Sequence, residues 1–316
     1  MSTVKEAAIE ISGLTYRYGD RTAVQDLHLT VGRGQIFGLL GPNGGGKTTT
    51  FNAITTRFRL PAGVVRVAGF DVALDACHVR RRIGVVFQSP ALDLKLTVTE
   101  NLRHHGHLYG LAGKELGDRI ERTLRLVGLA DRAGELVEQL SGGMRRRVEI
   151  AKVLLHEPEI LIMDEPTTGL DPAARATIWQ HLRQLRNQRG VTILLTTHLF
   201  DDAERCDRIA ILDRGRLVAD GTPDELKAAV GGEVLIVEAE ELDDLASRME
   251  RDFAELRISI IRDHIRAEHP SVHALVPQLM ESYGSLIRSL RIGRPTLADA
   301  FYKFTGHEFD DAEAGE

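Results

Sequence analysis

The sequence predicts an α/β fold in which helices cover a largely parallel sheet, followed by a smaller α+β domain. Runs that are apolar on both faces alternate with helix-like stretches as far as about residue 230, the pattern of parallel strands buried between helices. A glycine-rich loop follows one of these runs directly. Beyond Val230-Gly231-Gly232 the order of strands and helices changes. We therefore predict one domain over residues 1–230 and a second over residues 231–316.

Five short apolar runs are the expected strands of the first domain. Each has the length of a strand and is too short for a buried helix. The stretch from Val98 to about Val137 is different, because it is helix-rich and contains no strand-like run. The five predicted strands are Ile36–Leu40, Ile83–Phe87, Ile160–Met163, Thr192–Thr196 and Ile209–Leu212.

The second domain is expected to be ferredoxin-like, because its elements follow the order strand-helix-strand-strand-helix-strand. A closing helix is predicted over Thr296–Phe304, with Thr296 as its N-cap and Gly306 just past its end. The six preceding elements are Glu233–Ala239, Leu242–Asp252, Leu256–Ile261, His264–Glu268, Ser271–Ser282 and Ser285–Ile292.

Size and composition are ordinary for a globular protein, with 316 residues of which 27% are charged. The net charge of -6 gives no electrostatic reason to expect a nucleic-acid partner. No apolar run approaches the roughly 18 residues of a spanning helix, and Met1–Glu10 lacks the apolar core of a signal peptide. Any membrane role is therefore expected to come through a partner. Cys77 and Cys206 are expected to be reduced thiols in the cytosol.

The glycine-rich loop has the residues of a phosphate-binding loop. Residues 41–48 fit the pattern G-x-x-x-x-G-K-[ST], with a predicted strand before them and a helix-compatible stretch, Thr49–Thr56, after them. Glycines let backbone N–H groups converge on phosphate oxygens, and the N-terminus of a helix adds free donors. Lys47 can reach the β- and γ-phosphates, and the Thr48 hydroxyl can bind Mg²⁺. The expected phosphate-binding residues are Gly41, Pro42, Asn43, Gly44, Gly45, Gly46, Lys47, Thr48 and Thr49.

A second motif places two adjacent carboxylates at the end of a predicted strand. Asp164 is placed to hold Mg²⁺, directly or through water. Glu165 can then polarise an attacking water as a general base. Acidic side chains also end strands for solubility alone, so this motif gains its force from the phosphate loop.

With these two motifs, the segment Leu140-Ser141-Gly142-Gly143-Met144 resembles the signature loop of the ATP-binding cassette family. It precedes an Arg-rich helix, about twenty residues ahead of Asp164. The resemblance covers about Ile9 to Lys227 and implies a P-loop NTPase with a RecA-like core, an antiparallel β subdomain and a helical subdomain. It also implies that Ser141, Gly142 and Gly143 close the ATP of a second copy of the chain, in a head-to-tail dimer.

The resemblance assigns further residues in sequence order. It implies that Tyr18 stacks on adenine, that Gln88 senses Mg²⁺ and the γ-phosphate, and that His198 reaches the γ-phosphate as a switch residue. Asp171 belongs to a loop that contacts the partner subunit. The implied catalytic residues are Glu165, His198 and Gln88, the metal ligands are Thr48, Gln88 and Asp164, and the cofactors are ATP and Mg²⁺.

The chain is most similar to the daunorubicin-resistance-type cassettes, which drive exporters and carry an extra C-terminal domain. The resembling segments are residues 165–172, 141–147 and 294–306. The resemblance implies an ATPase that powers export at the cytoplasmic face of the cell membrane through separate integral-membrane permease subunits. A groove beside Gln88 would accept a coupling helix of the permease. Met144 and Gly45 depart from the wider family, and neither change removes a catalytic group.

Two other functions stay open on the sequence alone. A soluble cassette ATPase of translation or DNA repair is one, although such proteins usually carry two cassettes, a long coiled coil or zinc insertions. A nucleotide sensor that binds without turnover is the other. His104, His105 and His107 could suggest a metal site, but a solvated helical face is the expected explanation. Arg145–Arg147 are expected to begin the signature helix rather than to bind nucleic acid.

Overall fold

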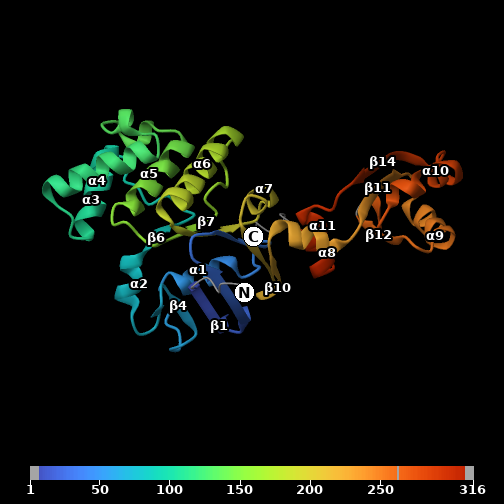
Figure 1. Ribbon diagram of the computed structural model, residues 1–316, viewed down its shortest axis with the longest axis horizontal. Helices are drawn as coiled ribbons and strands as arrows, with labels where there is room; N and C mark the ends of the chain where they lie inside the picture. Colours follow the sequence, from blue (N-terminus) through green and yellow to red (C-terminus); the bar gives the residue numbers. More distant parts are fainter. Residues whose placement is uncertain (1–6, 262, 310–316) are drawn as a thin grey trace. The chain divides into compact units, whose positions relative to one another are not determined.

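The computed structural model describes residues 7–261 and 263–309. The described residues form two compact units, one up to Val218 and one from Ala219 onward (Figure 1). Each unit has its own sheets and its own apolar core, and we describe each by itself. The predicted acidic tail, residues 310–316, lies outside the described residues.

A six-stranded sheet forms the centre of the first unit, in the order β10-β9-β3-β8-β7-β6. The pairs β9–β3, β3–β8, β8–β7 and β7–β6 are parallel, so the prediction of a largely parallel sheet is confirmed. Every predicted strand is found, with ends shifted by one residue at most. The strands are β3 (Ile36–Leu40), β6 (Ile83–Val86), β7 (Ile160–Asp164), β8 (Thr192–Thr197), β9 (Arg208–Asp213) and β10 (Arg216–Gly221).

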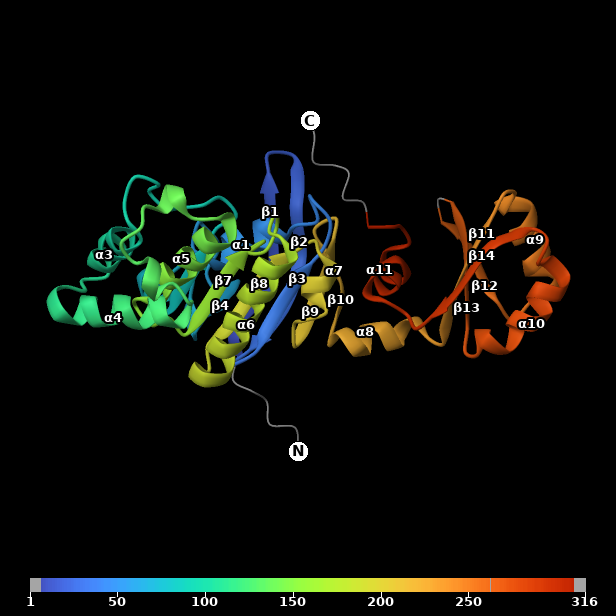
Figure 2. The same cartoon turned by 90° about the horizontal axis from the view of Figure 1, so that it is seen from above.

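Central strands β3, β7 and β8 are buried along their whole length, which explains their continuous apolar sequences. Helices follow the strands in sequence and pack beside them (Figures 1 and 2). The helices are α1 (Lys47–Ile54), α2 (Ala76–Arg82), α6 (Pro172–Arg189) and the short α7 (Phe200–Ala203). Because the parallel strands share one direction, their carboxyl ends meet at one edge of the sheet, where the predicted motifs lie.

A smaller antiparallel sheet has the order β2-β1-β4-β5. Its apolar side chains join those of β3 and α1 in one core. The sheet is the antiparallel β subdomain that the resemblance implied. Its strands are β1 (Ala7–Tyr18), β2 (Arg21–Gly32), β4 (Val65–Val67) and β5 (Phe70–Asp71).

The stretch predicted to be helix-rich contains two helices and two short 3₁₀ turns. Thr97 and Glu100 form a reciprocal capping box that fixes the start of α3 (Val98–Leu108). α3 packs with α4 (Gly113–Leu126) and with α5 (Gly142–Leu154), the helix that follows the signature segment (Figure 1). The 3₁₀ turns are Ala130–Arg132 and Val137–Gln139.

The second unit contains the predicted order strand-helix-strand-strand-helix-strand. Its four strands form an antiparallel sheet in the order β12-β13-β11-β14, with the two hairpin strands at one side and the first and last strands at the other. Side chains of the sheet and both helices form a separate core around Leu235 and Ile265. The elements are β11 (Glu233–Ala239), α9 (Leu242–Asp252), β12 (Arg257–Ile261), β13 (His264–His269), α10 (Val272–Tyr283) and β14 (Ile287–Gly293).

The closing helix α11 (Leu297–Thr305) has the predicted caps, with Thr296 at its start and Gly306 in a left-handed conformation at its end. It packs against α8 (Pro223–Val230), and Lys303 donates to the carbonyl oxygens of Ala229 and Val230. This contact groups α8 with the second unit, so the compact units divide at 218/219, whereas the sequence pattern changes at 230/231.

Candidate functional site

The predicted phosphate loop connects β3 to α1. A Cβ atom at Gly41 would lie 2.2 Å from the carbonyl oxygen of Leu212, so only glycine fits there. Gly46 has φ 101° and caps α1, a backbone conformation that favours glycine. A Cβ at Gly45 would lie 3.0 Å from the carbonyl oxygens of both Leu212 and Pro42, so the third glycine serves a tight turn. α1 begins at Lys47, two positions before the predicted start.

Lys47 is almost fully buried beneath the loop. Its ammonium donates to the carbonyl oxygens of Gly41 (2.7 Å) and Pro42 (3.0 Å), and it lies 3.8 Å from Glu165 Oε1. A cavity of about 330 Å³ opens above it. The cavity is lined by Tyr18, Arg21, Ala23, Pro42, Asn43, Gly44, Gly46, Lys47, Thr48, Thr49, Gln88 and Glu165. Residues from four separate parts of the sequence therefore meet at one cationic cavity.

Glu165 lies just past the end of β7 and has φ 45°, an uncommon conformation for a residue with a side chain. Its carboxylate accepts hydrogen bonds from Gln88 Nε2 (3.1 Å) and Thr168 Oγ1 (3.2 Å). His198 Nδ1 lies 3.1 Å from Oε1 of the same group. The predicted base thus contacts both predicted γ-phosphate residues, Gln88 and His198.

Asp164, the last residue of β7, is buried beside the central strand β8. Thr196 Oγ1 donates to Asp164 Oδ1 (2.5 Å) and accepts from the backbone N–H of Glu165 (3.0 Å). One hydroxyl therefore orients the Asp164 carboxylate and holds the backbone of Glu165. Burial raises the pKa of Asp164, against the lowering effect of the Thr196 hydrogen bond, and the neighbouring Glu165 charge adds to the rise.

The pKa of Glu165 moves in the opposite direction. Burial alone would raise it, but the hydrogen bond and charge of His198, together with the Lys47 charge, outweigh burial and lower the pKa of Glu165. The carboxylate is consequently ionised at neutral pH, as a general base must be.

The signature residues lie at the start of α5 and do not line the cavity. Ser141 caps the helix by accepting from the backbone N–H of Met144 (3.3 Å) and is exposed. Gly143 packs so closely on α6 that a Cβ there would lie 2.6 Å from Ala174 Cβ. Asp171 caps α6 by accepting from the N–H of Ala174 (2.9 Å). Thus Ser141, Gly142, Gly143 and Asp171 are absent from the cavity lining of their own chain.

The structure adds residues that the sequence did not single out. Arg21 and Ala23 line the cavity beside Tyr18, from the strand that pairs with β1. Thr168 and Thr196 orient the two carboxylates. One sequence signal could have indicated the role of Thr196. It lies at the end of the predicted strand Thr192–Thr196, and the neighbouring strand of the sheet ends at Asp164.

The set-aside histidines are only partly as expected. His104 and His107 are exposed on α3, but His105 is only partly exposed, and its ring lies 5.2 Å from that of Tyr109, which stacks on His156 with 3.9 Å between centroids. The expectation of a solvated face is therefore wrong for His105, because its ring lies near those of Tyr109 and His156 instead of in solvent. Within residues 7–261 and 263–309, no group of three or more potential ligands is placed to hold a metal.

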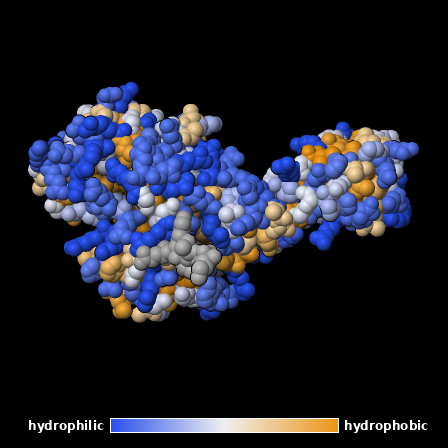
Figure 3. Space-filling view, in the orientation of Figure 1, coloured by the Kyte–Doolittle hydropathy of each residue, from blue (hydrophilic) through white to orange (hydrophobic). Residues whose placement is uncertain are grey.

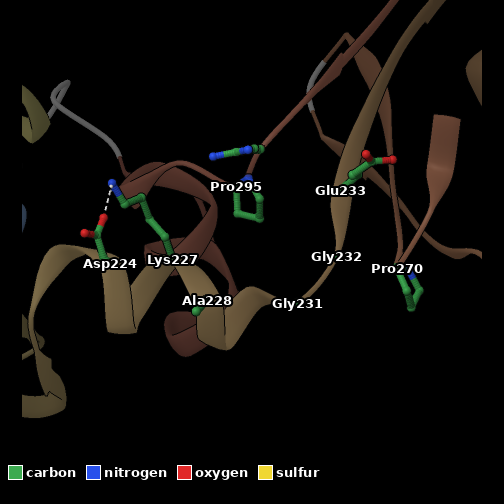
Figure 4. A pocket seen from close by; sticks show the side chains of 9 residues that line it. Asp224, Lys227, Ala228, Gly231, Gly232, Glu233, Pro270 and Pro295 are labelled. Atoms are coloured by element: carbon green, nitrogen blue, oxygen red, sulfur yellow. Dashed lines mark ion pairs between the residues drawn. The ribbon is translucent and has the colours of Figure 1, made fainter.

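A second cavity, of about 470 Å³, lies in the second unit between the end of α8 and the start of β11 (Figure 4). Lys227 there pairs with Asp224 at 3.1 Å. No predicted site residue contributes to it.

Across the part of the chain that the structure describes, every helix is too short or too polar to cross a membrane. Figure 3 shows a largely hydrophilic surface over α3 and α4, with hydrophobic residues gathered over β11 and β14.

Three features define a P-loop nucleoside triphosphatase of the cassette type. They are the phosphate loop between β3 and α1, the buried Lys47 in that loop, and the acidic pair at the end of β7, two strands away from β3 in the sheet. The profile of the ABC transporter family matches residues 24–168. The chain is 38% identical to daunorubicin resistance ATP-binding protein DrrA3 of Streptomyces coeruleorubidus over 96% of its own length and 97% of the relative's. This chain belongs to the ABC transporter family as one of its ATP-binding, ATP-hydrolysing subunits.

Other relatives and solved structures agree. Nod factor export ATP-binding protein I of Cupriavidus pinatubonensis is 40% identical, over 96% of this chain and 93% of that protein. CbiO1 of Clostridium perfringens, part of the cbiONQ ABC transporter complex, superimposes with a TM-score of 0.66 at 26% identity, over 79% of this chain and 97% of that one. A dimeric ATP-binding cassette bound to ADP and Pi superimposes with a TM-score of 0.60 at 29% identity, over 68% and 98%.

Proposed function

We propose that ATP binds in the cationic cavity and that Glu165 is the general base of its hydrolysis. The observation that carries this proposal is the Glu165 carboxylate, held within hydrogen-bond distance of Gln88, Thr168 and His198 at the mouth of the phosphate cradle. Lys47 and the loop N–H groups would neutralise the phosphates, and His198 would contact the γ-phosphate. Tyr18, about half exposed beside the loop, would stack on the adenine ring.

Mg²⁺ would be held by Thr48, Gln88 and Asp164 together with phosphate oxygens. These side chains fit the ion, because Mg²⁺ prefers oxygen ligands and binds through one or two carboxylates plus substrate phosphates. Asp164 supplies a buried carboxylate already oriented by Thr196. When bound, the ion supplies positive charge to the bridging and terminal phosphate oxygens.

The complete site would need two copies of the chain. Ser141 is exposed at the N-terminus of α5 and Gly143 lies in its first turn, a position that suits an anionic phosphate, yet both are outside the cavity of their own chain. In a head-to-tail dimer, each signature segment and each Asp171 loop would contact the nucleotide site of the other copy. The similarity to a dimeric cassette bound to ADP and Pi supports this arrangement.

We further propose that the direction of transport is export. The chain would act at the cytoplasmic face of the cell membrane and would drive separate permease subunits. Support comes from the relatives, because one group is named for Nod factor export and another for daunorubicin resistance. Both groups align with this chain over nearly its whole length.

The base is tested by replacing Glu165 with glutamine, which keeps the size and removes the charge. We expect Glu165→Gln to bind ATP, to dimerise stably and to lose about 10²–10⁴-fold in turnover. The measurements are ATPase rate, ATP affinity and size-exclusion light scattering. Glu159→Gln is the matched control, because Glu159 precedes the other end of β7 and pairs with Arg33 and Arg82 on the surface. If Glu165→Gln still hydrolysed ATP at the wild-type rate, Glu165 would not be the general base.

The membrane partnership is tested by co-expression with integral-membrane subunits encoded beside this chain. We expect the chain to co-purify with them from detergent-solubilised membranes, and their presence to change its ATPase rate. A chain that stays entirely in the soluble fraction under these conditions would contradict the proposed partnership.

A further inference from the structure

Residues 87–91, which follow β6 and include Gln88, form neither helix nor strand; we call them the glutamine segment. A backbone outside regular structure needs other partners for its polar groups. Four of these groups, the carbonyl oxygens of Phe87, Gln88 and Ala91 and the N–H of Ala91, are bonded by side chains of α5.

Arg146 holds the first half of the segment. Its Nη1 donates to the carbonyl oxygen of Phe87 (2.7 Å) and its Nη2 donates to that of Gln88 (3.2 Å). Nη1 also donates to Glu149 Oε2 at 3.0 Å. The side chains of Arg146 and Glu149 are only 9% and 4% exposed, so the ion pair is buried.

Glu149 and Lys152 hold the second half. Glu149 Oε1 accepts from the N–H of Ala91 (2.7 Å), and Lys152 Nζ donates to the carbonyl oxygen of Ala91 (2.6 Å). Because Arg146, Glu149 and Lys152 are spaced three residues apart, they lie along one face of α5. The helix thus presents a cation, an anion and a cation in sequence to one short segment.

A role in stability alone does not explain this arrangement. A buried ion pair contributes little to stability compared with apolar side chains of the same volume, because both charges lose their hydration. What the planar guanidinium provides is geometry, since its fixed fork contacts two consecutive carbonyl oxygens at once. Those two carbonyls flank the Cα atom of Gln88 and so fix where its side chain starts.

We propose that Arg146 and Glu149 are positioning residues that hold Gln88 in register with the nucleotide site and tie it to α5, the helix that begins at Ser141. This inference rests on the proposed function of Gln88. In the proposed dimer, α5 reaches the partner's nucleotide through its first residues and reaches its own chain's nucleotide site through Arg146. A rigid helix would then transmit a displacement at one ATP site to the glutamine of the other.

The test uses the purified full chain and measures kcat, KM for ATP and the half-saturating Mg²⁺ concentration. Arg146→Lys keeps the charge and loses the fork, and Glu149→Gln keeps the size and loses the charge. Because a misplacement of about 1 Å can cost about 10²-fold, we expect kcat to fall by about that factor and the Mg²⁺ requirement to rise. KM for ATP should change little, since the loss is in the transition state.

A double variant and a control separate positioning from folding. The apolar pair Arg146→Met with Glu149→Leu should fold, as judged by circular dichroism, yet show the same loss of kcat. Arg119→Met is the matched control, because Arg119 donates to the carbonyl oxygen of Leu155 (2.8 Å) just past the other end of α5. We expect its kcat and Mg²⁺ response to equal those of the wild type.

A double-mutant cycle with Gln88→Ala tests whether Arg146 acts through Gln88. If Arg146 acts through Gln88, Arg146→Lys should lower kcat little further in the Gln88→Ala background. Wild-type kcat and Mg²⁺ response in both Arg146→Lys and Glu149→Gln, with a clear defect in Gln88→Ala, would overturn the inference and leave the proposed role of Gln88 standing. Wild-type kinetics in Gln88→Ala would overturn that role and this inference with it.

Discussion

The pKa values of two consecutive carboxylates at the end of β7 are shifted in opposite directions because their surroundings differ. Asp164 faces inward beside β8, where burial raises its pKa. Glu165 faces the cavity, where His198 and Lys47 lower its pKa. The backbone turns at Glu165, which has a positive φ, and this turn directs the two side chains apart. One peptide bond thus separates the proposed metal ligand from the proposed base, because different surroundings give these like residues different pKa values.

His105 gives the molecule a predicted acid sensitivity. Burial, with the nearby charges of Lys152 and His156, lowers the pKa of His105 to about 4 from an unfolded value of 6.5. Between those values the unfolded state binds more protons, so the free energy of unfolding falls as pH decreases, by at most about 1.4 kcal/mol per pH unit. We expect His105→Gln to weaken this dependence, measured by urea unfolding at several pH values from 7 to 4.

His104→Gln is the control for this measurement, because His104 lies on the same helix and is exposed. It should retain the pH dependence of the wild type. The acidic groups of the chain titrate in all three proteins, so only the difference between wild type and variant matters. Equal slopes in wild type and His105→Gln between pH 6.5 and 4 would contradict the buried, uncharged His105.

At the scale of elements, the core strands were predictable and their side-chain partners were not. β3 and β11 both have the predicted ends. For β3 the reason is a continuous apolar run bounded by Gln35 and Gly41, which leaves little choice. The contacts of Arg146 were not predictable, because they join residues almost sixty positions apart, and an Arg-rich helix start has the same sequence whether its side chains face solvent or a buried loop. Loop partners depend on tertiary packing, which periodicity does not encode.

One buried link between elements joins the loop after Glu165 to the helix after His198. Asp202 of α7 is fully buried, and its carboxylate accepts from Trp179 Nε1 of α6 (2.7 Å) and from the Thr167 hydroxyl. Because Thr167 is two residues from Glu165 and Asp202 is four residues from His198, this carboxylate connects the chain segments that carry both. One carboxylate of α7 therefore accepts hydrogen bonds both from α6 and from the loop after Glu165.

Asp202→Asn should break this link, because an amide nitrogen replaces one acceptor oxygen and leaves a buried donor unpaired. We expect the free energy of unfolding to fall by about 1–3 kcal/mol. Trp179 is the only tryptophan of the chain, so its fluorescence reports this site alone, and its emission should shift to longer wavelength. Asp201→Asn, an exposed neighbour 3.8 Å from Arg175, should change the free energy by less than about 0.5 kcal/mol. Identical emission spectra for wild type and Asp202→Asn would contradict the link.

At the scale of the whole molecule, the sequence predicted two parts but placed their division after α8. The capping box of Thr222 and Glu225 shows where α8 begins, but nothing local shows that α8 packs on α11. Lys303 bonds the last carbonyls of α8 from more than seventy residues away. A composition change at Val230 therefore marks the start of the strand-helix module, whereas the compact unit starts before α8.

The proposed site is complete only when a second copy of the chain contributes its signature segment. Ser141, at the exposed start of α5, should be required for assembly and not for the first binding of ATP, because it does not line its own chain's cavity. In a Glu165→Gln background, we expect Ser141→Arg to bind ATP normally and to remain a monomer in ATP-containing buffer, measured by light scattering, since a bulky side chain would fill the space for the partner's phosphates.

Loss of a helix cap must be separated from loss of the interface. Thr222→Arg in the same background removes the cap of α8, where Thr222 accepts from the N–H of Glu225 (3.1 Å), and should cost a similar amount of about 0.5–2 kcal/mol. Its ATP-dependent dimer should persist, because α8 belongs to the other unit. ATP-dependent dimers of Ser141→Arg equal to those of its parent would mean that the signature segment does not contact a second nucleotide site. Monomers of Ser141→Arg beside dimers of Thr222→Arg would place the catalytic competence of this subunit in the pair rather than in the chain.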